Sequence, residues 1–185
     1  MPIIVLAALA VGYYFYLSNR DIAPKQQNTT NSEITKIVTR NLDGQYYPQF
    51  PRDVVLLYAK IVKEYYGSNV TETDIELLGK QARKLFDEEL LEKNPEDEFF
   101  TNLKADIKAY NDLERIITNI DVEKANDIKV FTFEEKSYAT VKVGYLVREK
   151  SSVDTICQQY TLRKDDNGQW KILYWESYVP DEDDE

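Results

Sequence analysis

The side chains able to carry chemistry in this chain are carboxylates and phenols, because the sequence contains no His and only one Cys, Cys157. Without His, a Ser-His-Asp or Cys-His nucleophile pair and a His-ligated zinc site are excluded. A single Cys forms no intramolecular disulfide and no thiolate cluster. Cys157 lies inside a predicted strand, where we expect it to be inert packing.

The main candidate for acid-base chemistry is Glu176, near the end of the last predicted strand. Alternation of side chains along this strand places Glu176 on the same face as Tyr174, and neighbouring strands offer Tyr145 and Tyr160. A carboxylate among aromatic rings can have a raised pKa and act as a base. The alternative is that Glu176 lies in solvent at the open rim of the sheet.

A second cluster of carboxylates consists of Asp87, Glu88, Glu89 and Glu92. No further ligands follow at a diagnostic spacing, and the Gly-kinked arrangement of a calcium loop is absent. We interpret the cluster as a solvated helix end and expect neither a metal nor another cofactor.

The other side of the last strand carries Leu173, Trp175 and Val179, a set too apolar for a freely solvated face. This pattern predicts a surface that forms a homodimer or binds a protein partner. The alternative, which we weigh equally, is a strongly bent sheet that wraps its own edge around these residues.

Charge excludes one large class of partners. The chain has 33 acidic and 23 basic residues, a formal net charge of −10, and an acidic run fills residues 181–185. With no basic stripe, nucleic-acid binding is not expected.

The predicted secondary structure that must position these residues changes once along the chain, from helices in the first half to strands in the second. Helical periodicity predicts three helices: one from Pro51 to a stop at Gly67, one from Thr71 or Thr73 to residue 94, and one over 95–111. Thr73 and Glu76 have the spacing of a capping box.

The second half alternates apolar and polar residues, which is typical of strands. Five strands are expected, and a tight hairpin is predicted at Asn167-Gly168. Helices followed by consecutive hairpins indicate an α+β domain whose helices cover one face of an antiparallel meander. The expected strands span residues 116–122, 128–133, 138–148, 153–163 and 169–179.

The first nineteen residues contain no charge and would span roughly 28 Å as a helix, about the thickness of a hydrocarbon core. We therefore expect a transmembrane anchor over residues 1–19; a cleaved signal peptide and a buried core helix are the alternatives. Residues 20–45 are expected to be a polar tether, although Ile34, Ile37 and Val38 have the spacing of one amphipathic turn. The positive charges that follow residue 19 would place the domain in the cytoplasm.

The run from Gln159 to Leu173, with its polar Gly turn and Trp170-Lys171-Ile172 strand, resembles the last hairpin of the NTF2-like (cystatin-like cone) superfamily. More specifically, the chain is similar to a family of small membrane-anchored proteins of Gram-positive anaerobic bacteria. This resemblance implies an NTF2-like domain over residues 46–180, a single-pass membrane protein and an extracytoplasmic domain. The matching residues are 47–48, 51–52, 65–66, 85–91, 94–95, 103–107 and 162–172.

The predicted fold is therefore a transmembrane helix followed by three helices packed on a curved antiparallel sheet, an NTF2-like cone, with an acidic tail at 181–185. The predicted function is a membrane-tethered, non-catalytic binding or assembly module of the cell envelope. The alternative function, from a different class, is that of a small enzyme or ligand-binding protein that uses Glu176 and a Tyr in the cone.

Overall fold

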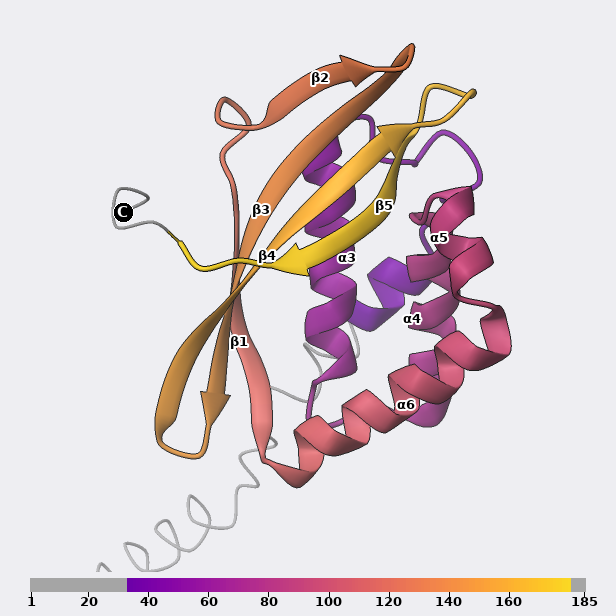
Figure 1. Cartoon of the computed structure of the whole chain (residues 1–185). Helices are drawn as coiled ribbons and strands as arrows, with labels where there is room; N and C mark the ends of the chain where they lie inside the picture. The colour runs from indigo at the N-terminus through magenta and orange to yellow at the C-terminus, as the bar shows by residue number, and fades with distance from the viewer. Residues whose placement is uncertain (1–32, 181–185) are drawn as a thin grey trace, which may run out of the picture.

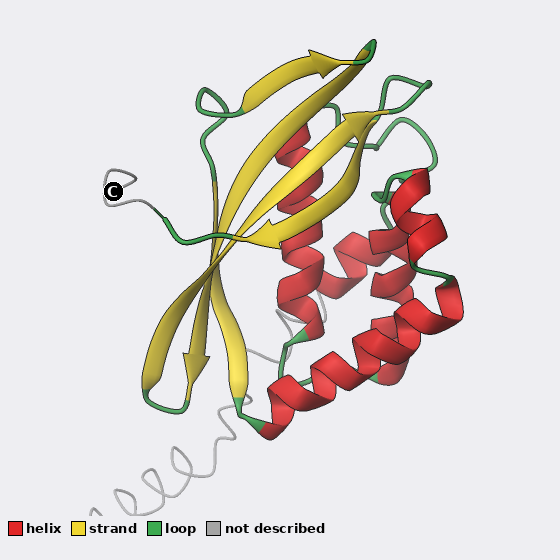
Figure 2. Ribbon diagram, viewed as in Figure 1, coloured by secondary structure: helices red, strands yellow, loops and turns green. Residues whose placement is uncertain are grey.

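The computed structural model describes residues 33–180, which form an α+β fold with helices on one face of an antiparallel sheet (Figures 1 and 2). A short helical turn covers residues 33–38. The remaining elements are α3 (Pro51–Tyr65), α4 (Glu72–Lys84), α5 (Glu88–Lys93), α6 (Glu96–Asp112), β1 (Arg115–Val122), β2 (Lys129–Phe133), β3 (Lys136–Glu149), β4 (Ser152–Lys164) and β5 (Trp170–Ser177).

Helix α3 forms as its sequence predicts. Pro51 occupies its first turn, where a missing N–H costs nothing, and the helix ends just before Gly67. Its apolar face is buried against the sheet, in particular at Val54, Val55, Tyr58, Ile61 and Tyr65.

The second predicted helix is divided in two. A capping box formed by Thr71 and Asp74 starts α4, two residues before the Thr73 and Glu76 box that the sequence suggested. After α4, residues 85–87 leave the helix and run beside β5. There Ile172 donates to the Leu85 carbonyl and accepts from the Asp87 N–H, both at 2.8 Å.

The sheet is five-stranded and antiparallel, in the order β1-β3-β4-β5, with β2 also beside β3. The expected strands all form, within a few residues of their expected ends. The expected meander is wrong at one point, because β1 and β2 do not pair with each other. The long strand β3 pairs with β2 through residues 136–140 and with β1 through residues 143–149.

One face of the sheet meets the helices and forms the core. Along β3 the buried residues alternate, as predicted, with half-buried or exposed ones. Ile34 and Ile37 of the 33–38 turn are also buried in this core, so this part of the expected tether packs on the domain. The buried core residues of β3 and β4 are Ala139, Val141, Val143, Tyr145, Val147, Tyr160 and Leu162.

The predicted fold class needs two corrections. Residues 33–180 contain four named helices and a helical turn rather than three helices. Moreover, none of the helices described in this part of the chain is long and apolar enough to cross a membrane, so the predicted class of a membrane helix joined to an NTF2-like cone is corrected to an α+β fold with a five-stranded antiparallel sheet. The segment predicted to span, residues 1–19, lies outside the described residues, as does the acidic run at 181–185.

The hairpin between β2 and β3 contains a strained turn. Its two central residues, Glu134 and Glu135, have φ angles of 46° and 65°, a conformation that favours Asn-Gly and that costs an ordinary L-residue roughly 1–2 kcal/mol. We expect Glu134→Asn combined with Glu135→Gly to raise the free energy of unfolding by about 1–2 kcal/mol in urea titrations.

A matched control is available in the other hairpin. Gly168 has a φ of 78°, so Gly168→Ala should lower the free energy of unfolding by about 1 kcal/mol. Unchanged stability of the Asn-Gly variant would contradict the assignment of strain to the Glu134-Glu135 turn.

Candidate binding pocket

A β-bulge in β5 decides which of its side chains face the helices. Ile172 lies opposite Leu162 of β4, and Tyr174 lies opposite Thr161. Leu173 is therefore an extra residue without its own partner. Because side chains alternate along a strand, one extra residue exchanges the two faces for every residue that follows.

The bulge reverses the expected faces of β5. Trp175 lies opposite Tyr160 and faces the helices, although its expected place was the partner surface. Tyr174 and Glu176, both expected in the pocket, lie on the opposite face, where Tyr174 is 47% exposed. Tyr145 and Tyr160 stay together on the helix-covered face, so the structure keeps half of the predicted pocket set.

Beneath Trp175 a half-open pocket of about 300 Å³ lies between the helices and the sheet. This volume is at the lower end of the range for small-molecule sites. Helices α3, α5 and α6 and strands β4 and β5 contribute its walls, together with the residues on either side of α5. The lining residues are Tyr58, Val62, Tyr65, Tyr66, Phe86, Leu90, Asn94, Phe99, Asn102, Leu103, Asp106, Gln158, Tyr160 and Trp175.

The wall of the pocket is a cluster of aromatic rings in mutual contact. The centroid of Tyr58 lies 5.5 Å from that of Phe86 and 5.6 Å from that of Trp175. Tyr160 lies 5.7 Å from Tyr58 and 5.9 Å from Trp175. Such edge-on and tilted contacts hold the rings at fixed angles, so the wall is preformed.

A chain of hydroxyl groups runs beneath this wall. The hydroxyl oxygens of Tyr145 and Tyr160 lie 2.7 Å apart, and the Tyr160 hydroxyl donates to Oε1 of Gln158 at 2.7 Å. Since Tyr160 has one proton to give, Tyr145 is the donor to Tyr160. Burial raises the pKa of both phenols above the ordinary value, so they serve as neutral hydrogen-bonding groups.

The hydroxyl of Tyr65 is the polar atom in the pocket wall that this chain leaves unsatisfied. Tyr65 is 3% exposed, and its hydroxyl has no hydrogen-bond partner among the described residues. Burial also raises the pKa of this phenol, which keeps the proton available for donation. A buried hydroxyl without a hydrogen-bond partner costs about 1–3 kcal/mol.

The charge of the pocket is set by Asp106, the one formally charged side chain among the described residues that line it. Asp106 is exposed on α6, close to Tyr66 and Tyr110, whose rings stack at 4.1 Å. Burial, followed by Tyr110 and Asp106, raises the pKa of Tyr66. Among the lining residues, the formal charge therefore lies at the exposed edge of the pocket, on Asp106.

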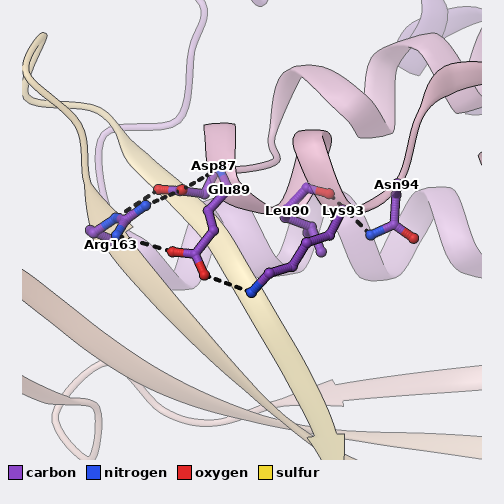
Figure 3. A network of polar contacts seen from close by, with 6 residues as sticks. All are labelled: Asp87, Glu89, Leu90, Lys93, Asn94 and Arg163. Atoms are coloured by element: carbon purple, nitrogen blue, oxygen red, sulfur yellow. Dashed lines mark hydrogen bonds and ion pairs between the residues drawn. The ribbon is translucent and has the colours of Figure 1, made fainter.

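The carboxylate cluster expected at a solvated helix end has a structural role (Figure 3). Asp87 accepts from the Glu89 N–H at 3.0 Å and so caps α5. The Arg163 guanidinium, reaching from β4, donates to both oxygens of Asp87, and its Nε lies 3.0 Å from Oδ2. Glu89 lies 3.5 Å from the same guanidinium and 2.7 Å from Lys93. This network fixes α5, which supplies Leu90 to the pocket.

Other candidate residues are dispersed. Leu173 is the half-buried extra residue of the bulge, and Val179 lies exposed beyond β5, so neither joins Trp175 in one surface. Cys157 is half-buried in β4. Within residues 33–180 no group of three or more potential ligands is arranged to hold a metal ion. The predicted binding roles of the pocket and partner residues remain predictions.

Sequence reasoning missed most of the pocket wall. Tyr58, Tyr65 and Phe86 fit the apolar periodicity of helices, which predicts a packed core at these positions and gives no sign of a cavity. One signal was present, because Tyr65-Tyr66 places two phenols in the last turn of an apolar helix, where their hydroxyl groups need partners.

Comparison with known proteins places the chain as follows. A family model described as "Domain of unknown function (DUF6715)" matches residues 1–175. No curated protein sequence matches the chain. Among solved structures, one match is the NMR solution structure of a transfer protein, TraH, from the Gram-positive conjugative plasmid pIP501. The identity is 15%, the TM-score is 0.32, and the match covers 73% of this chain and 99% of that one. So low a TM-score assigns neither a fold family nor a function.

Proposed function

The chain belongs to this DUF6715 family, and we propose that it is a non-catalytic binding module whose aromatic pocket receives one small organic group. That group belongs either to a free ligand or to a side chain of a protein partner; the chemistry of recognition is the same. It has an apolar body, accepts a hydrogen bond and is neutral or positively charged.

The observation that carries this proposal is an aromatic pocket of about 300 Å³ whose wall includes Tyr65, a buried phenol with no hydrogen-bond partner for its hydroxyl among residues 33–180. Hydrophobic walls with a few convergent polar groups are the usual form of a ligand site. Here the aromatic rings would supply contact area, and the Tyr65 hydroxyl would fix the orientation of an acceptor.

The sign of the charge follows from the rim. Asp106 is the charged residue that lines the pocket, so it would repel an anionic ligand and attract a cation, which the faces of the rings would also attract; the Arg83 guanidinium, 5.3 Å from the centroid of Phe99, opposes this preference from behind the wall. Because the phenols are neutral, binding should change little between about pH 6 and pH 9.

The enzyme alternative requires a carboxylate inside the pocket, and its candidate was Glu176. The bulge directs Glu176 to the opposite face of the sheet, away from Tyr145 and Tyr160. This geometry supports a binding role over acid-base catalysis through Glu176.

Binding is testable with three probes of one shape: benzyl alcohol, which can accept a hydrogen bond from Tyr65; benzylammonium, which has no acceptor and tests the attraction of a cation alone; and benzoate, an anionic acceptor. We expect benzyl alcohol and benzylammonium to shift the amide resonances of pocket residues, with a Kd of about 1 mM or tighter, which is reasonable for so few atoms. Benzoate should bind at least about fivefold more weakly, because Asp106 repels it. If none of the three perturbs the pocket, the proposed function is wrong.

The variant Tyr65→Phe separates binding from folding. It should weaken binding of benzyl alcohol about three- to tenfold, the value of one hydrogen bond. The same substitution should leave the free energy of unfolding unchanged or raise it by about 1 kcal/mol, because it removes an unpaired buried hydroxyl. Tyr174→Phe, on the opposite face, is the matched control and should alter neither quantity.

A further inference from the structure

Strand β2 is an open edge of the sheet. It pairs with β3 on one side, and no segment within residues 33–180 pairs with it on the other. All five residues of β2 are exposed, Val130 by 59% and Phe133 by 58%. Phe131 and Phe133 share one face with Tyr138 of β3, and their ring centroids lie 5.6 and 6.4 Å from that of Tyr138. An edge strand with such side chains is a template for another strand.

The turn geometry decides which backbone groups of β2 are available. The two-residue turn at Glu134-Glu135 is closed by Phe133 and Lys136, and in such a hairpin the closing pair exchanges both hydrogen bonds. Phe133, Phe131 and Lys129 therefore direct their backbone groups toward β3. The N–H and C=O groups of Val130 and Thr132 point to the open edge.

We propose that β2 pairs antiparallel with β2 of a second copy of this chain, so that one sheet continues through both. A two-fold axis beside Thr132 makes the contact self-complementary. In that register Thr132 pairs with Thr132 of the other copy, and Phe131 of each copy lies opposite Phe133 of the other. Lys129 then lies beside the Glu134-Glu135 turn of the other copy, within reach of its long side chains.

Charge selects this register over its neighbour. Sliding the second copy by two residues would pair Thr132 with Val130 and bring Asp127, in place of Lys129, toward the Glu134-Glu135 turn, which places like charges together. In the proposed register the Glu134-Glu135 turn of each copy lies beside Lys129 of the other copy, so opposite charges meet at both ends of the contact. This pairing of opposite charges favours a second copy over an unrelated strand.

The contact involves a short strand, so the dimer is weak. One strand pairing buries less surface than a standard interface, and its Kd should lie between roughly 10 and 1000 µM. This surface is separate from the aromatic pocket, since none of the residues of β2 lines it. The two proposals therefore stand or fall independently.

Cross-linking of the full chain tests the register. In a Cys157→Ser background, which removes the single Cys, Thr132→Cys places two thiols beside the two-fold axis, within disulfide range. Mild oxidation should give a covalent dimer. Val130→Cys in the same background is the matched control, because Val130 lies opposite Glu134 and its copies are too far apart to join. Equal cross-linking of both variants, or of neither, overturns the proposal.

Exchanging the charges of Lys129 and Glu135 tests whether the partner of β2 is a second copy of this chain. Sedimentation of the full chain should show dimers that weaken at least about fivefold in Lys129→Glu, through two pairs of repelling charges. Combining Lys129→Glu with Glu135→Lys should restore the wild-type Kd. If Lys129→Glu dimerises like wild type, or if the double variant does not recover the wild-type Kd, the proposal is wrong. Circular dichroism of each variant confirms that the fold is intact.

Discussion

Replacing Asp87 by Ala should lower the free energy of unfolding by about 3–5 kcal/mol. Asp87 is 4% exposed, and its carboxylate accepts from Arg163 through both oxygens. Removing it takes away both hydrogen bonds that the mostly buried guanidinium makes to Asp87 and leaves it the longer 3.5 Å contact with Glu89, which costs far more than the loss of a surface ion pair. The first turn of α5 also loses its cap, which contributes about 1 kcal/mol. Urea unfolding followed by circular dichroism measures the change.

Two further variants divide this effect into its parts. Asp87→Asn keeps an acceptor for the Glu89 N–H but removes the charge, so it should cost less than Asp87→Ala. Glu88→Ala changes a neighbouring exposed carboxylate in the same helix turn and should cost less than about 0.5 kcal/mol. If Asp87→Ala resembles Glu88→Ala, the pair with Arg163 does not hold α5 in place.

The second large effect separates two adjacent aromatic residues. Trp175→Ala should cost about 2–4 kcal/mol, since the ring packs against Tyr58, Phe86 and Tyr160. We place this below the cost of a fully buried ring because Trp175 is 36% exposed. Tyr174→Ala should cost less than about 1 kcal/mol, because Tyr174 lies on the opposite face.

This pair of substitutions is a direct test of the bulge at Leu173. A regular strand would place Tyr174 in the core and Trp175 outside, which reverses the two expected costs. Unfolding measurements on both variants therefore decide between the two registers. Phe50→Ala, at an exposed ring before α3, gives the baseline for losing an aromatic side chain from the surface.

Periodicity was a reliable guide wherever a regular element continued without interruption. The buried face of α3 and the alternating residues of β3 follow from the apolar pattern alone, because each pattern has a fixed period that the backbone geometry enforces. The same reasoning identified all five strands within a few residues of their ends. It also recognised the Asn167-Gly168 turn, where Gly168 has the positive φ angle that such a turn requires.

Errors arose where a long-range contact interrupted a regular pattern. The residues from Thr71 to Asn94 read as one helix, yet the chain leaves the helix at Leu85 because residues 85–87 bond to Ile172, far away in the sequence. Likewise, β1 and β2 do not form a hairpin because β3 is long enough to pair with each of them in turn. Neither contact has a local signal.

By itself the sequence determined the α+β class, the main buried faces and the absence of His and thiolate-cluster chemistry, since composition and local periodicity suffice for these. Which residues line the pocket was decided by the tertiary structure alone. One extra residue, Leu173, moves Trp175 inward and Glu176 outward, and the packing of the helices on the sheet buries the Tyr65 hydroxyl beside a cavity, with no hydrogen-bond partner among the described residues. The physical reason is that a bulge and a cavity arise from how separate elements meet, and hydrophobic periodicity within one element records neither.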